Sequence, residues 1–479
     1  MPSLKKNIFY QNLYQLFIAL TPLITAPYIS RVLGAYNIGI NSYVTSITSF
    51  FVLFAMLGIK SHGSRAIAIV RNDRKKLNKT FSDLLTLHLI ISLIVFLLYI
   101  IFILLSTDEY KLYFIILVLM VLSAVFDINW FFAGIEQFKL TVTRSGLVKI
   151  GSVILTFALV KTENDLWLYI LISAMGIFLS NAIIWAFLKK YVTFVKPSLS
   201  GIYTHIRPVF LLFISVLSIS VYSNLNRIML GNMAGEVQLG FYTNAQKIIG
   251  VVLSFIYAFN GVMIPRMSNV SNQGNLAEVK RLISLSTKYV MLLALAFAFG
   301  IAAIAKDFTP LFFGREFREA GYLLVGLSTM IPFIAFQNII STQHLIPNQK
   351  DKEFTLAYII GAVISIPLNL ILIPIYQAMG VVITRVVVEV VICIIISIFA
   401  RKDFSILLYL KNALFFFFAG MAMLLLVKLA GYYMGYNVMT LLLQITIGAI
   451  FYLGICGGYL YLTKDEFLLK NLKLLRRGK

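Results

Sequence analysis

The chain has 479 residues, of which 60% are apolar and only 13% are charged. A soluble domain holds roughly 45–50% apolar and about 25% charged residues, so this composition and a mean hydropathy of +0.90 exclude an ordinary globular protein. At roughly 20 residues per crossing, the apolar content is enough for about fourteen membrane spans. In such a protein the net charge of +22 indicates positive-inside loops rather than nucleic-acid binding.

Fourteen apolar segments run along the chain without the alternation of polarity that a membrane barrel needs, so they predict helices. The segments are 13–29, 40–59, 84–105, 112–132, 147–160, 166–188, 208–230, 239–264, 289–304, 322–345, 354–375, 380–399, 413–434 and 438–462. No loop between them exceeds roughly 25 residues, which is shorter than a separate domain of about 50. The sequence therefore predicts an all-α, multi-pass membrane protein that works in or between its helices.

Basic residues alternate between rich and poor loops. With a cytoplasmic N-terminus, 31 of the 41 Lys and Arg residues fall on the cytoplasmic side, seven on the outer side and three within spans. Such an asymmetry over short loops determines orientation in membrane proteins. Both termini are therefore predicted to face the cytoplasm.

Two parts of the chain repeat one another. Gly39 is followed 26 residues later by Arg65, and Gly240 is followed by Arg266 at the same spacing. Six spans separate the copies, and an even number preserves orientation, so the halves are expected to be parallel repeats. Chance similarity between apolar helices is the alternative, since short motif matches are hypotheses.

An Arg-then-Gly turn precedes each copy, at Arg31–Gly34 and at Arg227–Gly231. The two turns differ in register by a few residues, as a loop insertion would produce. The predicted division is an N-terminal lobe with spans one to six, a C-terminal lobe with spans seven to twelve, and two extra spans with a basic tail. Their ranges are 1–195, 196–402 and 403–479.

Charged groups inside spans are costly, so each is a functional candidate. Asp127 lies in the cytoplasmic half of the fourth span, and Arg385 and Glu389 lie one turn apart in the twelfth. A mutually neutralised structural pair is the alternative for Arg385 and Glu389. For Asp127, the alternative is a permanent pair with Arg144 or Lys149.

Cationic residues mark both ends of the predicted lobes. Arg31 and Arg227 close the first and seventh spans on the outer side, and Lys247 lies in the outer half of the eighth. Arg65 and Arg266 lie at inner ends, where anchoring of the topology is an alternative role.

Uncharged polar residues recur on the seventh, eighth and tenth spans, including Tyr222, Asn226 and Gln337. Hydrogen bonding between helices explains some of them. So many together favour a wet cavity whose cations, amides and aromatic groups suit an anionic headgroup that carries hydroxyls. The four histidines, His62, His88, His205 and His344, show no ligand spacing, so no metal site is predicted.

The segment Pro27–Ala35 (PYISRVLGA), followed by Gly39, resembles the first-loop signature of polysaccharide repeat-unit flippases. These are the Wzx-type members of the multidrug/oligosaccharidyl-lipid/polysaccharide exporter superfamily. Asn226–Gly231 (NRIMLG) with Gly240–Tyr242 (GFY) is similar to the matching turn of the second lobe, and Ile264–Ser268 (IPRMS) to its exit. The resemblance covers nearly the whole chain, and the motifs are specific through their common order and spacing.

The resemblance implies a V-shaped, alternating-access transporter with two six-helix lobes and two C-terminal helices. It would move undecaprenyl-diphosphate-linked oligosaccharide to the outer leaflet of the bacterial cytoplasmic membrane, for capsule, O-antigen or exopolysaccharide synthesis. The branch that flips the peptidoglycan precursor carries more arginines in its first two spans than the single Arg31 here, which favours the polysaccharide branch.

The expected site follows from the cationic and polar residues together with this substrate. The expected substrate-binding residues are Arg31, Arg65, Arg227, Lys247, Arg266, Tyr222, Asn226 and Gln337. Asp127, or less favourably Glu389, would couple transport to an H⁺ or Na⁺ gradient. No other cofactor is expected, and the expected partners are the lipid-linked substrate, membrane lipids and other polysaccharide-assembly proteins, not nucleic acid.

Two other functions remain open on the sequence. One is a cation-coupled multidrug or metabolite antiporter of the same superfamily. The other is an enzyme, a polytopic glycosyltransferase or repeat-unit polymerase. Its acidic groups would lie on an outer loop, but the acidic pairs Asp108–Glu109 and Glu163/Asp165 lie on short loops and assemble no site. The prediction is therefore a transporter and not an enzyme.

Overall fold

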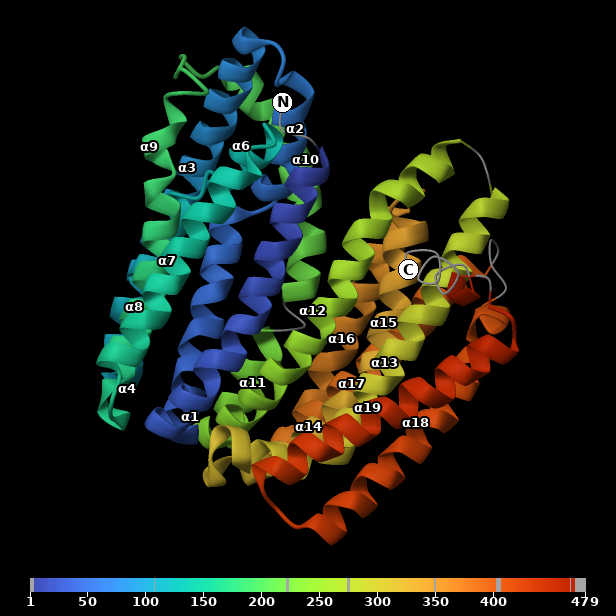
Figure 1. Cartoon of the computed structure of the whole chain (residues 1–479). Helices are drawn as coiled ribbons and strands as arrows, with labels where there is room; N and C mark the ends of the chain where they lie inside the picture. The colour runs from blue at the N-terminus through green and yellow to red at the C-terminus, as the bar shows by residue number, and fades with distance from the viewer. Residues whose placement is uncertain are drawn as a thin grey trace. The chain divides into compact units, whose positions relative to one another are not determined.

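The computed structural model describes residues 4–106, 108–220, 224–273, 276–348, 350–401, 406–465 and 467–469. It is 90% helical, and no strand occurs in the residues it describes (Figure 1). This confirms the predicted all-α class.

Within the described ranges, thirteen helical segments are long and apolar enough to cross a membrane, against the fourteen predicted. The difference lies at the start of the chain, where Leu20–Val70 counts as one segment. Its first helix, α1 (Leu4–Met56), has 53 residues, which would measure about 80 Å if straight, against a hydrocarbon core of about 30 Å. Gly34 breaks it with φ 74° and ψ 173°. One segment therefore holds both of the first two predicted spans.

The chain forms two compact units. The first contains Met1–Asn244 and Thr355–Thr384, and the second contains Ala245–Phe354 and Arg385–Lys479. Helices α12 (Glu236–Asn272) and α17 (Ala378–Ala400) each have residues in both units. The predicted lobes follow the repeat rather than the contacts, so that division remains a prediction.

The other helices of the first unit are short or long segments in chain order. They are α2 (Ile59–Val70), α3 (Arg74–Leu105), α4 (Asp108–Ile116), α5 (Val118–Val125), α6 (Asn129–Gly134), α7 (Phe138–Leu159), η1 (Glu163–Asp165), α8 (Leu166–Ile183), α9 (Trp185–Leu188), α10 (Leu199–Ser220), α11 (Asn226–Ala234) and most of α16 (Asp351–Tyr376).

The second unit is built from α13 and the helices that pack on it. Its further elements are α13 (Leu276–Phe313), η3 (Arg315–Phe317), α14 (Arg318–Ser328), α15 (Ile331–Ile340), the π-helical turn η4 (Ser341–Leu345), α18 (Ile406–Met434) and α19 (Val438–Leu462).

A cluster of buried aromatic rings fixes α6 within the first unit. Phe81 of α3 packs against Trp130 and Phe131 of α6. Gly63 of α2 makes room for the indole, because a Cβ there would lie under 3.0 Å from Trp130. This packing places the residues just before α6, including Asp127, at a fixed position.

The repeat is visible in the backbone, with one correction to its predicted register. Gly235 has φ 84° and ψ 172°, almost the values of Gly34, and each glycine separates two helices. The partner of Gly34 is therefore Gly235 and not Gly231. With this pairing, one offset of 201 positions relates Gly34 to Gly235, Gly39 to Gly240 and Arg65 to Arg266. No loop insertion is needed.

Loops predicted to share the cytoplasmic side contact one another in the first unit. Arg71, before α3, forms an ion pair with Glu136, before α7. Asn78 of α3 accepts a hydrogen bond from the backbone N–H of Thr193, after α9. Helix α3 begins here because Asp73 caps it, and the backbone N–H of Lys76 is the main cause of the lowered pKa of Asp73.

Loops predicted to be outer also meet in the first unit. Asn37 donates a hydrogen bond to the backbone oxygen of Glu163 in η1, and the Tyr110 hydroxyl donates to Glu236 at the start of α12. In the first unit, loops predicted to lie on the same side of the membrane thus contact one another at each of the two ends. Which end faces the cytoplasm remains a prediction.

Thiol labelling measures that orientation. In a background with Cys393 and Cys456 replaced by alanine, we expect Asn72→Cys and Asn164→Cys to react with an impermeant maleimide from opposite sides, Asn72→Cys from the cytoplasm. Both positions are exposed, and the reason is the basic asymmetry. Labelling of both from the same side would contradict the topology.

Candidate functional site

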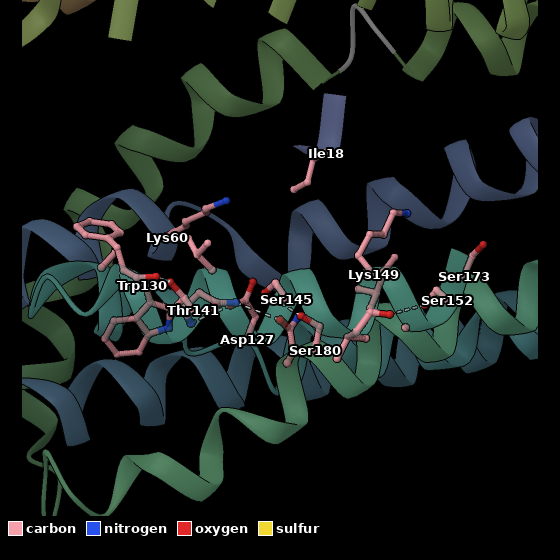
Figure 2. A pocket seen from close by; sticks show the side chains of 18 of the residues that line it. Ile18, Lys60, Asp127, Trp130, Thr141, Ser145, Lys149, Ser152, Ser173 and Ser180 are labelled. Carbon is pink, nitrogen blue, oxygen red and sulfur yellow. Dashed lines mark hydrogen bonds between the residues drawn. The ribbon is translucent and has the colours of Figure 1, made fainter. Parts of the chain in front are cut away.

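A cavity of about 700 Å³ opens within the first unit. Its walls come from α1, α2, the segment before α6, α7 and α8, and Figure 2 shows its side chains. Cavities of this volume are typical of small-molecule sites. The cavity is therefore the candidate functional site.

Helix α7 provides one polar wall. Thr141, Ser145, Lys149, Ser152 and Thr156 all line the cavity, and their spacing of three or four residues places them on one face of the helix. The facing helix α8 adds Ser173, Ser180 and Asn181. The walls therefore present many hydroxyl groups inside an apolar bundle.

Asp127 lies in the non-helical break between α5 and α6, at residues 126–128. Its Oδ1 accepts hydrogen bonds from the backbone N–H of Asn129 at 2.9 Å and from Asn129 Nδ2 at 2.7 Å. Non-helical backbone at membrane depth is tolerated where it is buried in protein or lines a cavity. The break therefore fixes the carboxylate at the cavity wall.

Asn129 connects Asp127 to Arg144 of α7. Arg144 is buried, and its Nη2 donates to Asn129 Oδ1 at 3.0 Å and to Ser145 Oγ at 2.9 Å. Asn129 Nδ2 also lies 3.0 Å from Asn181 Oδ1 on α8. The acid and the guanidinium are thus bridged by one amide.

Removal of that amide is expected to destabilise the first unit. Asn129→Ala leaves Arg144 and Asp127 without their shared partner, which should cost about 1–3 kcal/mol and lower the Tm measured by thermal unfolding in detergent. Asn164→Ala, on the exposed η1, is the matched control and should leave the Tm unchanged. Equal Tm values for the two variants would contradict the bridging role.

Two lysines make the cavity cationic. Figure 2 shows Lys60 of α2 and Lys149 of α7 extending to the same side as Ile18 of α1. Among the described residues, neither ammonium has an ion-pair partner within 4.0 Å, and Asp127 pairs with neither. The permanent Asp127–Lys149 pair that was the alternative on the sequence does not occur. Ammonium groups beside hydroxyls suit an anionic, hydroxyl-rich ligand.

Arg65 lies at the predicted cytoplasmic end and is exposed on α2. One turn away, His62 Nε2 lies 2.9 Å from Nδ1 of His205 on α10. These two histidines are far apart in the sequence, and only the fold brings them together. Arg31, near the end of the first half of α1, is exposed, and Arg227 of α11 is half-buried.

Asn226 is fully buried in a contact between helices of the first unit. Its Oδ1 accepts from Asn369 Nδ2 of α16 at 2.6 Å. It does not line the cavity. Its contact is the helix–helix hydrogen bonding that the sequence left open as an alternative.

In the second unit, Gln337 and Glu389 form one buried network. Gln337 Nε2 donates to Glu389 Oε2 at 2.6 Å, and Arg385 Nη2 lies 3.6 Å from Glu389 Oε1. The pairing of Arg385 and Glu389 that was the structural alternative on the sequence is thereby observed. Lys247, also in this unit, is half-buried on α12.

Two expected site residues lie beyond what the structure describes. Tyr222 falls outside the described residues, and only the helical backbone of Arg266 in α12 is described. Their roles remain predictions.

Residues 4–271 match the family described as "Polysaccharide biosynthesis protein". The match covers more than half of the 479 residues. The chain belongs to this family. The resemblance seen in the short motifs is thereby confirmed.

Relatives of this family member cover most of its length. It is 26% identical to a protein of Shigella dysenteriae whose name assigns it to O-antigen transport, over 81% of this chain and 98% of that protein. It is 23% identical to the capsular polysaccharide biosynthesis protein CapF of Staphylococcus aureus, over 83% and 100% of the two chains.

Solved structures share the fold of this polysaccharide biosynthesis protein. A lipid II flippase, MurJ, in an inward closed conformation gives a TM-score of 0.75 at 16% identity, over 95% of this chain and 98% of that one. An inward-facing multidrug resistance transporter of the MATE family and MOP superfamily gives 0.63 at 16% identity, over 82% and 97%. At this identity the likeness concerns the fold alone.

The sequence predicted a polar cavity on the seventh, eighth and tenth spans, whereas the described cavity of this family member lies on α7 and α8, the fifth and sixth spans. The spacing of Thr141, Ser145, Lys149 and Ser152 was a signal for it. Lys60 had no comparable signal, because only the fold brings α2 beside α7.

Proposed function

We propose that this protein is a flippase that moves undecaprenyl-diphosphate-linked oligosaccharide repeat units from the inner to the outer leaflet by alternating access. The family, the transport and polysaccharide names of its relatives, and the fold it shares with a lipid II flippase support this. The proposal makes the protein a transporter and not an enzyme or a drug antiporter.

The single observation that carries the proposal is the cavity of about 700 Å³ in a chain of this family. Its hydroxyl-lined walls match a sugar, and Lys60 and Lys149 match a negative charge. A hydrophobic drug would gain little from such walls, because burying their hydroxyl and ammonium groups without partners is costly.

The remaining parts of the proposal concern place and partners. The protein lies in the bacterial cytoplasmic membrane with both termini in the cytoplasm, as the basic loops indicate. Its partners are the lipid-linked substrate, membrane lipids and other polysaccharide-assembly proteins. In this proposal Arg31, Arg227 and Lys247 hold the diphosphate, and Arg65 and Arg266 guard the cytoplasmic mouth. Tyr222 stays a predicted member of the set, whereas Asn226 and Gln337 are engaged in buried hydrogen bonds within their own units.

Reconstitution tests the function. Purified protein in proteoliposomes with a fluorescent undecaprenyl-diphosphate-linked oligosaccharide should make the label in the inner leaflet accessible to an external, membrane-impermeant quencher. Protein-free liposomes are the control. A label distribution equal to that of protein-free liposomes would overturn the proposal.

We also propose that Asp127 couples transport to an ion gradient. Its carboxylate lines the cavity and forms no ion pair among the described residues, which places it to bind a transported H⁺ or Na⁺. Glu389 is the weaker candidate, because its carboxylate already contacts Arg385 and accepts a hydrogen bond from Gln337.

Asp127→Asn is expected to abolish the dependence of flipping on an imposed H⁺ or Na⁺ gradient and to leave substrate binding intact, because the amide cannot ionise. Rates measured in proteoliposomes with and without the gradient check this. Glu319→Gln, which replaces an exposed carboxylate on α14, is the control and should keep the gradient dependence. Asp127 is not the coupling group if its variant keeps it too.

A further inference from the structure

The break between α5 and α6 changes the hydrogen bonding of the backbone at the end of α5. If α5 continued, the backbone N–H of Asp127 would bond to the oxygen of Ser123. It donates instead to the oxygen of Ala124, at 3.1 Å. A carbonyl group that loses its helical partner inside a membrane span is costly, because no water is there to replace the bond. Donors from other helices must therefore satisfy the end of α5.

His88 of α3 supplies one of these donors. Its side chain is fully buried, and its Nε2 lies 3.0 Å from the oxygen of Ala124. A carbonyl oxygen can only accept, so Nε2 carries the hydrogen and donates it. The oxygen of Ala124 thus binds both the imidazole of His88 and the backbone N–H of Asp127.

Two further side chains complete the set of donors. Asn181 Nδ2 of α8 donates to the oxygen of Ser123 at 3.0 Å. Trp185 Nε1 of α9 donates to the oxygen of Phe126 at 2.9 Å. Asn181 also accepts from Asn129 Nδ2 at 3.0 Å, so it connects the two sides of the break. Side chains from α3, α8 and α9 therefore hold the backbone just before Asp127.

We propose that His88, Asn181 and Trp185, which we call the carbonyl clamp, are positioning residues for the coupling carboxylate of Asp127. The inference rests on the proposed function and on the coupling role proposed for Asp127. The carbonyl clamp replaces hydrogen bonds that a continuous helix would make within itself, and it thereby stabilises the break.

The break in turn fixes the carboxylate. Asp127 Oδ1 accepts the backbone N–H of Asn129 at 2.9 Å. In a continuous helix that N–H would bond to the oxygen of Val125 instead. Loss of the carbonyl clamp favours the continuous helix, because its backbone then satisfies its own carbonyl groups. Asp127 would lose the bond that holds it at the cavity wall.

A pair of substitutions at His88 tests the carbonyl clamp. The side-chain amide of His88→Gln can still donate to the oxygen of Ala124, whereas His88→Leu cannot. In proteoliposomes with fluorescent undecaprenyl-diphosphate-linked oligosaccharide, we measure the ratio of flipping rates with and without the ion gradient. We expect His88→Leu to lower this ratio at least several-fold and His88→Gln to restore most of it. A wild-type ratio in His88→Leu, or equal losses in both variants, would overturn the proposal.

A smaller change covers the case in which His88→Leu does not fold. Trp185→Phe keeps an aromatic ring beside Phe126 but cannot donate to its oxygen, so it should also lower the ratio. The matched control is Trp167→Phe, at an exposed position of α8 that does not line the cavity, and it should keep the wild-type ratio. Equal ratios in the two variants would contradict the positioning role.

A labelling rate tests the position of residue 127 without any transport. In the background without Cys393 and Cys456, Asp127→Cys lies at the cavity wall and should react with a small cationic methanethiosulfonate reagent. We expect added His88→Leu to change this rate at least several-fold and added His88→Gln to leave it near its original value. An unchanged rate with His88→Leu would overturn the carbonyl clamp.

The two measurements separate the proposals. If labelling follows the expected pattern but the wild type moves no lipid, the proposed function is wrong and the carbonyl clamp stands. If the wild type flips and its rate ignores the gradient, the coupling role is wrong, and the positioning role is overturned with it.

Discussion

Valine in place of Gly39 or Gly240 is expected to reduce flipping by at least about tenfold. The new Cβ would overlap a carbonyl oxygen of the other half of the repeat, and backbone cannot turn aside as a flexible side chain can. The two backbones must then part at this contact, so the packing between the two halves of the repeat in the first unit is lost. Flipping in proteoliposomes and maleimide labelling of Ser42→Cys in the same variant measure the two consequences.

The matched control is Gly454→Val in α19. A Cβ at Gly454 meets no heavy atom within 4 Å, so the same substitution there tests the change of residue without the contact. We expect full flipping. Equal loss in Gly454→Val and Gly39→Val would mean that valine acts through helix propensity and not through the backbone contact between the repeats.

Alanine in place of Arg31 or Arg227 is expected to lower flipping roughly 10- to 100-fold, the value of one charge-assisted hydrogen bond of about 1.5–3 kcal/mol. A guanidinium binds phosphate oxygens through two parallel hydrogen bonds, so lysine should restore part of the rate but not all of it. Initial rates with the diphosphate-linked substrate, at matched protein levels, measure the difference.

Lys428→Ala is the control for that series. Lys428 is exposed on α18, outside the repeat, and its long side chain can reach the membrane interface. Its replacement should leave the rate unchanged. If alanine at Arg31, Arg65, Arg227, Lys247 and Arg266 together left the rate unchanged, the cationic site would be wrong.

Much of the fold was predictable because the membrane allows few solutions. Backbone groups in lipid must be satisfied within the segment, so apolar runs of about 20 residues become helices. The fourteen predicted spans appear with the first two joined in one helical segment at Gly34. The register of the repeat was less accessible, because Gly231 and Gly235 look alike in the sequence, and only φ and ψ distinguish them.

The candidate site, too, was predictable from the sequence only in part. The spacing of Thr141, Ser145 and Lys149 determines that they share a face of α7, because helical periodicity acts within one segment. The bridge from Asp127 through Asn129 to Arg144 depends on a helix break and on two segments packing together, which no local pattern encodes.

The sequence by itself determined the class of protein, the spans, the charge asymmetry and the existence of a repeat, since each depends on composition and spacing along the chain. Only the tertiary structure decided which helices line a cavity, that Asp127 and Lys149 form no ion pair with each other, and that Gly39 and Gly240 face backbone of the opposite repeat. The physical reason is that such contacts join residues far apart in the chain, and their geometry is fixed by helix packing rather than by neighbouring residues.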